Sequence, residues 1–148
     1  MKQIKAFPKL VFDKHFTDKE FKYYDYACFI SILDIDNNEQ KFDKSIDNFL
    51  QVKMWDIEED LFENGELKYE KPNDNELKNI VYFINKHKDK SVFIVHCSAG
   101  ISRSGAVATF LYDKFLSEID KEQFRRENKH IRPNLYILNR LKYINFRV

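Results

Sequence analysis

The chain has 148 residues, of which 43% are hydrophobic and 16% are aromatic. This length and composition are typical of a single folded domain, residues 1–148, and they exclude general disorder. The 25 basic and 24 acidic residues nearly cancel. That balance excludes a chain-wide attraction to nucleic acid or to an acidic membrane.

The sequence also limits the expected cellular setting. The N-terminal segment lacks the apolar run of a signal peptide, and no apolar stretch is long enough to span a bilayer. Cys28 and Cys97 are the only cysteines, which is too few for a disulfide framework. We therefore expect a monomer in a reduced, cytoplasmic compartment, without a membrane partner.

The predicted elements alternate between helices and strands. Thr17 with Glu20, and Asn73 with Glu76, are capping signals that mark helix starts. The alternation predicts a single-domain α/β fold with a central, mostly parallel sheet flanked by helices. In chain order, the sequence predicts a short helix at 17–24, strands at 26–33 and 49–55, a helix from Asn73, a strand at 91–95, a helix from near Arg103, and helices near 119–129 and 134–145.

The last predicted strand runs into a loop that is suited to bind an anion. His96 and Cys97 follow this strand directly, and Arg103 lies at the expected start of the next helix. Strand–loop–helix units direct backbone N–H groups and the positive end of the helix toward one point. Gly100 eases the tight backbone path that such a loop needs. The sequence therefore predicts an anion site between Cys97 and Arg103.

The ends of this loop carry a thiol and a guanidinium. Oriented N–H groups and a nearby cation favour the thiolate form of Cys97, which is a strong nucleophile. The planar fork of Arg103 suits two phosphate oxygens at once, and the Ser104 hydroxyl is expected to stabilise the sulfur as a leaving group. The expected phosphate-binding loop consists of Ser98, Ala99, Gly100, Ile101, Ser102 and Arg103.

Two segments of the chain resemble the protein tyrosine phosphatase superfamily. Residues 96–105, HCSAGISRSG, look like its signature of cysteine, five residues and arginine, in the form used by the dual-specificity branch. Residues 132–135, RPNL, resemble a second feature of that branch, whose asparagine, here Asn134, braces the phosphate loop. The resemblance covers at least residues 49–141. It implies a fold like that of dual-specificity phosphatases.

The resemblance implies a two-step reaction that needs no metal or other cofactor. Cys97 attacks phosphorus while a general acid protonates the leaving oxygen, and the same carboxyl then activates water. The family's acid is an aspartate on a loop after a strand, and Asp56 follows the strand predicted at 49–55. Glu59, Asp60 and Asp74 are alternatives, because the sequence predicts an enlarged loop over residues 58–72.

Several residues have a structural alternative beside the functional one. The resemblance implies that His96 bonds the loop and tunes the thiol rather than acting as a base. Asn134 is alternatively a helix N-cap. Cys28 is expected in the core, and a disulfide between Cys28 and Cys97 is the alternative. The basic residues between 121 and 132 are expected to form a solvated helix face, with an acidic substrate or RNA as the alternative partner.

The expected substrate is a phosphorylated protein. The residues between Cys97 and Arg103 are uncharged, whereas relatives that act on phosphoinositides often carry lysine there. We therefore expect hydrolysis of phosphotyrosine, together with phosphoserine and phosphothreonine if the enzyme is of dual specificity. The alternatives are a phosphoinositide or RNA 5′-phosphatase on the same fold, and a pseudophosphatase that binds phosphate without turnover.

Overall fold

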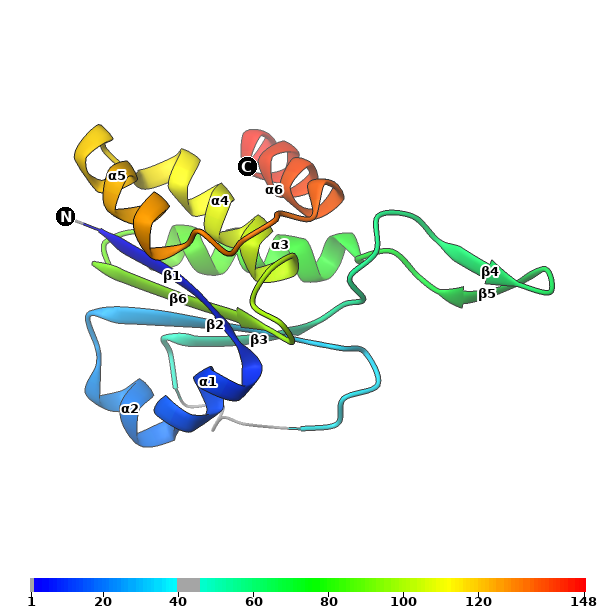
Figure 1. The fold of residues 1–148 in the computed structure, drawn as a ribbon, viewed down its shortest axis with the longest axis horizontal. Helices are drawn as coiled ribbons and strands as arrows, with labels where there is room; N and C mark the ends of the chain where they lie inside the picture. The colour runs from blue at the N-terminus through cyan, green and yellow to red at the C-terminus, as the bar shows by residue number, and fades with distance from the viewer. Residues whose placement is uncertain (1, 40–45) are drawn as a thin grey trace.

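A four-stranded parallel sheet forms the centre of the part of the chain that the structure describes (Figure 1). The structure is a computed structural model that describes residues 2–39 and 46–148. Every neighbouring pair of strands is parallel, so all four strands end at the same edge of the sheet. The strand order is β1 (Gln3–Pro8), β6 (Val92–Cys97), β2 (Ala27–Leu33) and β3 (Phe49–Lys53).

Helices cover both faces of this sheet (Figure 1). One face carries α1 (Lys9–His15) and α2 (Asp18–Tyr23). The other face carries α3 (Asp74–Lys86), α4 (Arg103–Phe115), α5 (Glu118–Glu127) and α6 (Leu135–Arg147). The arrangement confirms the predicted α/β fold with a parallel sheet flanked by helices. Among the described residues, no helix combines the length and apolarity needed to cross a membrane.

The alternation of side chains along β2 explains why the sheet has a core on each side. All seven residues of this strand are buried, which is typical of a parallel strand covered on both faces. Ile30 and Ile32 belong to the larger core, which α3, α4 and α6 also supply. Phe29 belongs to a smaller, aromatic-rich core that includes Phe12 of α1 and Phe21 of α2. Successive residues therefore pack in opposite directions.

The outer edge of β1 is satisfied by a side chain rather than by another strand. Asn128 accepts a hydrogen bond from the Ala6 N–H through Oδ1 at 3.0 Å. Its Nδ2 donates to the Ile4 carbonyl at 2.8 Å and to the Phe124 carbonyl at 3.1 Å. The buried amide thus pairs with backbone groups that an edge strand would otherwise leave open.

Most of the predicted elements form close to the expected residues. The Glu20 carboxylate accepts from the Thr17 N–H at 3.0 Å, and the Asn73 side chain accepts from the Asn75 N–H at 2.7 Å. Both capping signals therefore mark helix starts, as predicted. β1 and α1 were not predicted. The two buried residues of β1 are separated by the charged Lys5, so the sequence shows no continuous apolar run there.

Residues 58–72 contain a hairpin, and the expectation of an enlarged loop is corrected accordingly. β4 (Leu61–Glu63) and β5 (Glu66–Tyr69) pair antiparallel and are joined by Asn64 and Gly65. Both turn residues have positive φ, 54° and 80°, as a type I′ hairpin turn requires. The Asn-Gly pair was the sequence signal for this hairpin.

Replacement of Asn128 by leucine tests its contacts with β1. Leucine is similar in size but forms no hydrogen bonds, so the Ala6 N–H and the Ile4 carbonyl would be buried without partners. We expect the free energy of unfolding, measured by urea denaturation, to fall by roughly 2–3 kcal/mol. The same substitution at the exposed Asn79 should change it by less than about 0.5 kcal/mol. Equal losses at the two positions would contradict the role given to Asn128.

Candidate active site

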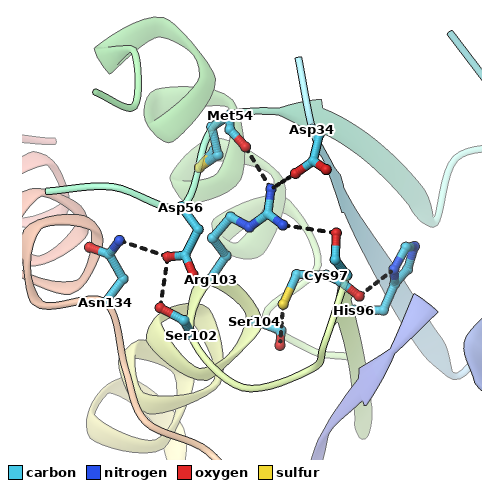
Figure 2. A network of polar contacts seen from close by, with 10 residues as sticks. Asp34, Met54, Asp56, His96, Cys97, Ser102, Arg103, Ser104 and Asn134 are labelled. Atoms are coloured by element: carbon cyan, nitrogen blue, oxygen red, sulfur yellow. Dashed lines mark hydrogen bonds and ion pairs between the residues drawn. The ribbon is translucent and has the colours of Figure 1, made fainter. Parts of the chain in front are cut away.

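The carboxyl ends of the strands meet around the segment that joins β6 to α4. Cys97 is the last residue of β6, and Arg103 is the first residue of α4. Asp34 follows β2, and Met54 follows β3. Ligands commonly bind at this edge of a parallel sheet, because the loops after the strands converge there. The sheet therefore brings these four residues together although they lie far apart in the sequence (Figure 2).

One side of the loop from Cys97 to Arg103 packs against the end of β1. The Lys9 N–H donates to the Ser98 carbonyl at 3.1 Å. Gly100 has a φ of +74°, and a Cβ at this position would lie 2.4 Å from the Pro8 nitrogen. Both the left-handed backbone and the close approach require glycine. β1 therefore constrains the path of the loop.

The other side of the loop contacts the segment that contains the RPN motif. The Arg132 N–H donates to the Ile101 carbonyl at 2.9 Å, and the Asn134 N–H donates to the Ser102 carbonyl at 3.0 Å. These are backbone contacts, so they hold the loop whatever side chain Arg132 carries. The loop is thus supported from both sides by segments near the two ends of the chain.

The Asn134 side chain contacts two separate segments of the chain. Its Oδ1 accepts from the Ile137 N–H at 3.0 Å, which is the geometry of a helix N-cap. Its Nδ2 donates to Asp56 Oδ1 at 3.0 Å and to the Ile57 carbonyl at 3.2 Å. The side chain therefore caps α6 and contacts the segment that carries Asp56, whereas the contact of Asn134 with the phosphate-binding loop is made by its backbone N–H.

The Cys97 side chain is nearly enclosed by the loop, with 2% of the residue exposed. Its Sγ lies 3.1 Å from Oγ of Ser104, in the first turn of α4. Ser104 is fully buried, so its hydroxyl has a defined position beside the sulfur. A thiolate only accepts hydrogen bonds. A hydroxyl donor at this distance would therefore stabilise negative charge on the sulfur.

The Arg103 guanidinium is held at one end by three partners (Figure 2). Nη1 donates to Asp34 Oδ1 and to the Met54 carbonyl, both at 2.7 Å, and Nη2 donates to Ser98 Oγ at 3.0 Å. Nε is buried and has no hydrogen-bond partner within the described residues. In a guanidinium, the Nε–H and one Nη2–H are neighbouring, parallel donors. Such a fork matches two oxygens of a phosphate group.

Asp56 contacts the loop directly. Its Oδ1 accepts from the Ser102 hydroxyl at 2.7 Å and from Asn134 Nδ2 at 3.0 Å (Figure 2). The residue is exposed to solvent. Asp56 therefore lies where a carboxylate was expected, after the strand β3 and beside the loop.

The alternative carboxylates have other surroundings. Asp60 accepts a hydrogen bond from the Lys71 N–H across the base of the hairpin, at 2.9 Å. Asp74 pairs with Arg140 at 2.7 Å. Glu59 is exposed and forms no hydrogen bond to the loop. The geometry therefore favours Asp56 among the carboxylates that the sequence left open.

His96 lies beneath the loop, in the core. Its Nε2 is 2.6 Å from Ser31 Oγ, and its ring centroid is 4.2 Å from that of Phe12. Nδ1 is 3.5 Å from the Cys97 carbonyl oxygen. Because His96 is fully buried, it has no access to the leaving group of a substrate. Its contacts fit a role in positioning the backbone at Cys97.

The sequence did not predict two of the partners of Arg103, Asp34 and the Met54 carbonyl. Asp34 had an available signal, since polar residues that follow parallel strands gather at one edge of the sheet. The Met54 carbonyl had none, because a main-chain group does not depend on residue type.

Cys28 is in the core of the sheet and does not approach Cys97. In the register of β2 and β6, Cys28 pairs with Phe93, four positions before Cys97. At roughly 3.3 Å per residue this offset is roughly 13 Å, well beyond the limit of about 7 Å between the Cα atoms of a disulfide. The expected core position is confirmed, and a disulfide between the two cysteines is excluded in this fold.

Comparison with known proteins identifies the family. The sequence profile of the protein-tyrosine phosphatase family matches residues 9–133, which is most of the chain. The chain belongs to the protein-tyrosine phosphatase family. The chain is also 33% identical over 64 residues to AMV078 of Amsacta moorei entomopoxvirus, which is named as a tyrosine-protein phosphatase. That match covers 42% of the chain and 39% of AMV078, so it spans well under two thirds of the viral relative.

Solved structures share the fold of this chain. Human DUSP28 is 12% identical with a TM-score of 0.55, and the match covers 97% of this chain and 92% of that one. PTPMT1, solved in complex with PI(5)P, is 18% identical with a TM-score of 0.51, and the match covers 98% and 91%. At these identities the likeness shows the fold alone. It confirms the predicted fold, which is like that of dual-specificity phosphatases.

The chemistry of Cys28 provides a test of the described packing. Burial raises the pKa of its thiol to about 12, so the thiol stays protonated at about pH 8. We expect iodoacetamide at this pH to leave Cys28 unmodified in the folded protein and to alkylate it after unfolding in urea, as read by mass spectrometry of a digest. Mild oxidation should yield no peptide that links Cys28 to Cys97. Either alkylation of Cys28 in the folded protein or such a linked peptide would contradict this packing.

Proposed function

We propose that this protein is a phosphatase that removes phosphate from proteins, above all from phosphotyrosine, through a cysteinyl-phosphate on Cys97. The observation that carries the proposal is the arrangement of donors around the loop. Ser104 Oγ lies 3.1 Å from the sulfur, and the Nε side of Arg103 is buried and unpartnered within the described residues. Together with the loop N–H groups and the N-terminus of α4, these donors would neutralise a phosphoryl group.

In the first step, the Cys97 thiolate attacks phosphorus. The S–P bond forms as the P–O bond to the leaving group breaks, and the leaving oxygen takes a proton from Asp56. Arg103 binds two of the phosphoryl oxygens through Nε and Nη2. Asp56 suits the role of acid because it lies at the loop, with Oδ1 held by Ser102 and Asn134.

In the second step, water replaces the enzyme sulfur on phosphorus. Asp56, now a carboxylate, accepts a proton from the water as its oxygen forms the new P–O bond. The S–P bond breaks, and the electron pair returns to sulfur as a thiolate. The Ser104 hydroxyl donates to that thiolate at the moment it leaves.

Asp34 contributes to this mechanism as a positioning residue. Its carboxylate binds Nη1 of Arg103 at 2.7 Å, the end of the guanidinium that faces away from the free Nε. The contact compensates the buried cation and restricts rotation of the fork. Asp34 would therefore act on the substrate only through Arg103.

The composition of the loop supports a substrate with a single phosphate. The residues from Ser98 to Ser102 are uncharged, so Arg103 is the cation that the loop itself presents. A ring with several phosphates would gain from further cations. The loop therefore favours phosphoproteins over phosphoinositides, although PTPMT1, which has the same fold, was solved with PI(5)P.

Substitution of Cys97 by serine tests the nucleophile. We expect kcat for an aryl phosphate to fall by at least about a thousandfold, because an alcohol does not ionise at neutral pH. Cys28→Ala is the matched control, since it removes the other thiol and should retain activity. Activity that survives Cys97→Ser would remove Cys97 from the mechanism. A wild-type protein that binds phosphopeptides without hydrolysis would instead be a pseudophosphatase.

The substrate class is tested with the wild-type protein in the same assay. A phosphotyrosine peptide, a phosphoserine peptide, a phosphoinositide and an RNA 5′-triphosphate are compared by kcat/KM. We expect the phosphotyrosine peptide to give the highest value. Faster release of phosphate from the lipid or the RNA would overturn the protein substrate.

Substitution of Asp56 by asparagine tests the general acid. Asparagine keeps an oxygen that can accept from Ser102 and Asn134, so the change removes the proton while preserving the contacts. We expect kcat for an alkyl phosphate, which has a poor leaving group, to fall by about a hundredfold or more. An activated aryl phosphate should be affected far less. Asp60→Asn is the control, and an equal effect of the two variants would assign the role to another carboxylate.

A further inference from the structure

The hairpin formed by β4 and β5 projects from the body of the phosphatase (Figure 1). Within the described residues its two strands pair only with each other. None of its residues belongs to either core. The hairpin therefore needs an explanation other than support of the fold.

One face of the hairpin is apolar and uncovered. Phe62 and Leu67 lie directly opposite each other in the register, so their side chains share a face. Phe62 is 65% exposed and Leu67 is 49% exposed. Adjacent exposed apolar side chains of this kind are typical of a contact surface for another molecule.

The other face is acidic. Glu63 and Glu66 lie directly opposite each other, an arrangement that repels across the strands. Lys68 pairs with Glu63 at 2.5 Å, whereas Glu66 has no ion pair within the described part of the chain. A cation supplied by a partner would relieve this repulsion.

The charge of the surrounding segment is unlike that of the whole chain. Residues 58–71 contain six acidic residues and two lysines, although the chain as a whole has a formal net charge of +1. The remainder of the chain is therefore net positive. The negative charge is concentrated on the hairpin and its base, which gives this surface complementarity to a basic partner.

The base of the hairpin is attached to the rim of the candidate active site. The ring of Tyr69 in β5 packs against that of Trp55, with centroids 5.1 Å apart, and Trp55 directly precedes Asp56. The Glu58 carboxylate accepts from the Leu135 N–H at 3.0 Å, at the start of α6. The base of the hairpin therefore adjoins the site, and the hairpin extends from there toward its turn (Figure 1).

We propose that the hairpin docks a basic segment of the phosphorylated protein substrate, one that carries apolar residues between its lysines or arginines. The proposal rests on the proposed function, since it names the partner of that same site. An extended segment can add to a free strand edge, with its cations on the acidic face and its apolar side chains on Phe62 and Leu67. A second copy of this chain fits less well, because symmetric pairing of two hairpins would bring their acidic faces together.

The experiment uses the full chain and a matched pair of synthetic peptides. Both contain phosphotyrosine, a Gly-Ser spacer and an extended segment, in which lysine alternates with valine in one peptide and glutamate alternates with valine in the other. Spacers of increasing length allow for the distance between the loop and the hairpin. The ratio of kcat/KM for each peptide to that for an aryl phosphate isolates docking from chemistry.

The hairpin variant is Glu63→Gln with Glu66→Gln, and the control is Glu118→Gln with Glu122→Gln on α5. Both variants remove two exposed carboxylates, so their net charge is the same. We expect the wild type to prefer the lysine peptide. For the lysine peptide, the hairpin variant should have a kcat/KM that is roughly tenfold lower than that of the wild type, because its KM is higher. This ratio corresponds to about 1.4 kcal/mol of binding free energy. Hydrolysis of the aryl phosphate should not change, and the control should behave as wild type.

A second variant tests the apolar face independently of charge. Phe62→Ser should also raise the KM for the lysine peptide, again with unchanged hydrolysis of the aryl phosphate. Equal use of the two peptides by the wild type at every spacer length would overturn the proposal. So would equal losses in the hairpin and control variants, or a wild-type dimer that Phe62→Ser dissociates in sedimentation.

A binding measurement separates this proposal from the proposed function. Fluorescence anisotropy with the unphosphorylated lysine peptide needs no catalysis. We expect the variant Glu63→Gln with Glu66→Gln to weaken this binding and the α5 control to retain it. That result supports docking even if no phosphate ester is hydrolysed. Absence of binding to the wild type, together with normal hydrolysis of the aryl phosphate, would refute docking and leave the phosphatase activity intact.

Discussion

The position of the Arg103 guanidinium depends on the ends of three parallel strands. Asp34 follows β2, Met54 follows β3, and Ser98 follows β6, and each contacts the guanidinium. An antiparallel sheet would place successive strand ends on opposite edges. A buried cation without partners is costly, so the fold must supply them. These partners engage Nη1 and Nη2, and Nε has no partner among the described residues, which leaves it available for the phosphate contact that we propose.

The loop that surrounds Cys97 also depends on segments outside itself. Its backbone is bonded on one side to Lys9 at the end of β1, and on the other to Arg132 and Asn134. Gly100 is required because the loop passes so close to Pro8. Donors that are already in place need no rearrangement as charge develops during phosphoryl transfer. The bracing contacts therefore matter to the proposed chemistry as well as to stability.

Asp56 and the hairpin belong to one continuous stretch of chain. The carboxyl proposed to move protons lies next to Trp55, and Trp55 packs on Tyr69 at the far strand of the hairpin. This ring contact therefore joins the hairpin to the segment that carries Asp56. Residues 58–72, which left more than one candidate for the acid in the sequence, also include the surface that we propose selects the substrate.

The sequence by itself determined the alternation of strands and helices and the strand–loop–helix setting of Cys97, because hydrophobic period and capping are local properties. It also narrowed the acid to a short list in which Asp56 came first. Only the tertiary structure decided that Asp34 holds Arg103, that β1 supports the loop, and that Cys28 is too far from Cys97 to form a disulfide. These features depend on strand order and register, which arise from contacts between residues distant in the chain.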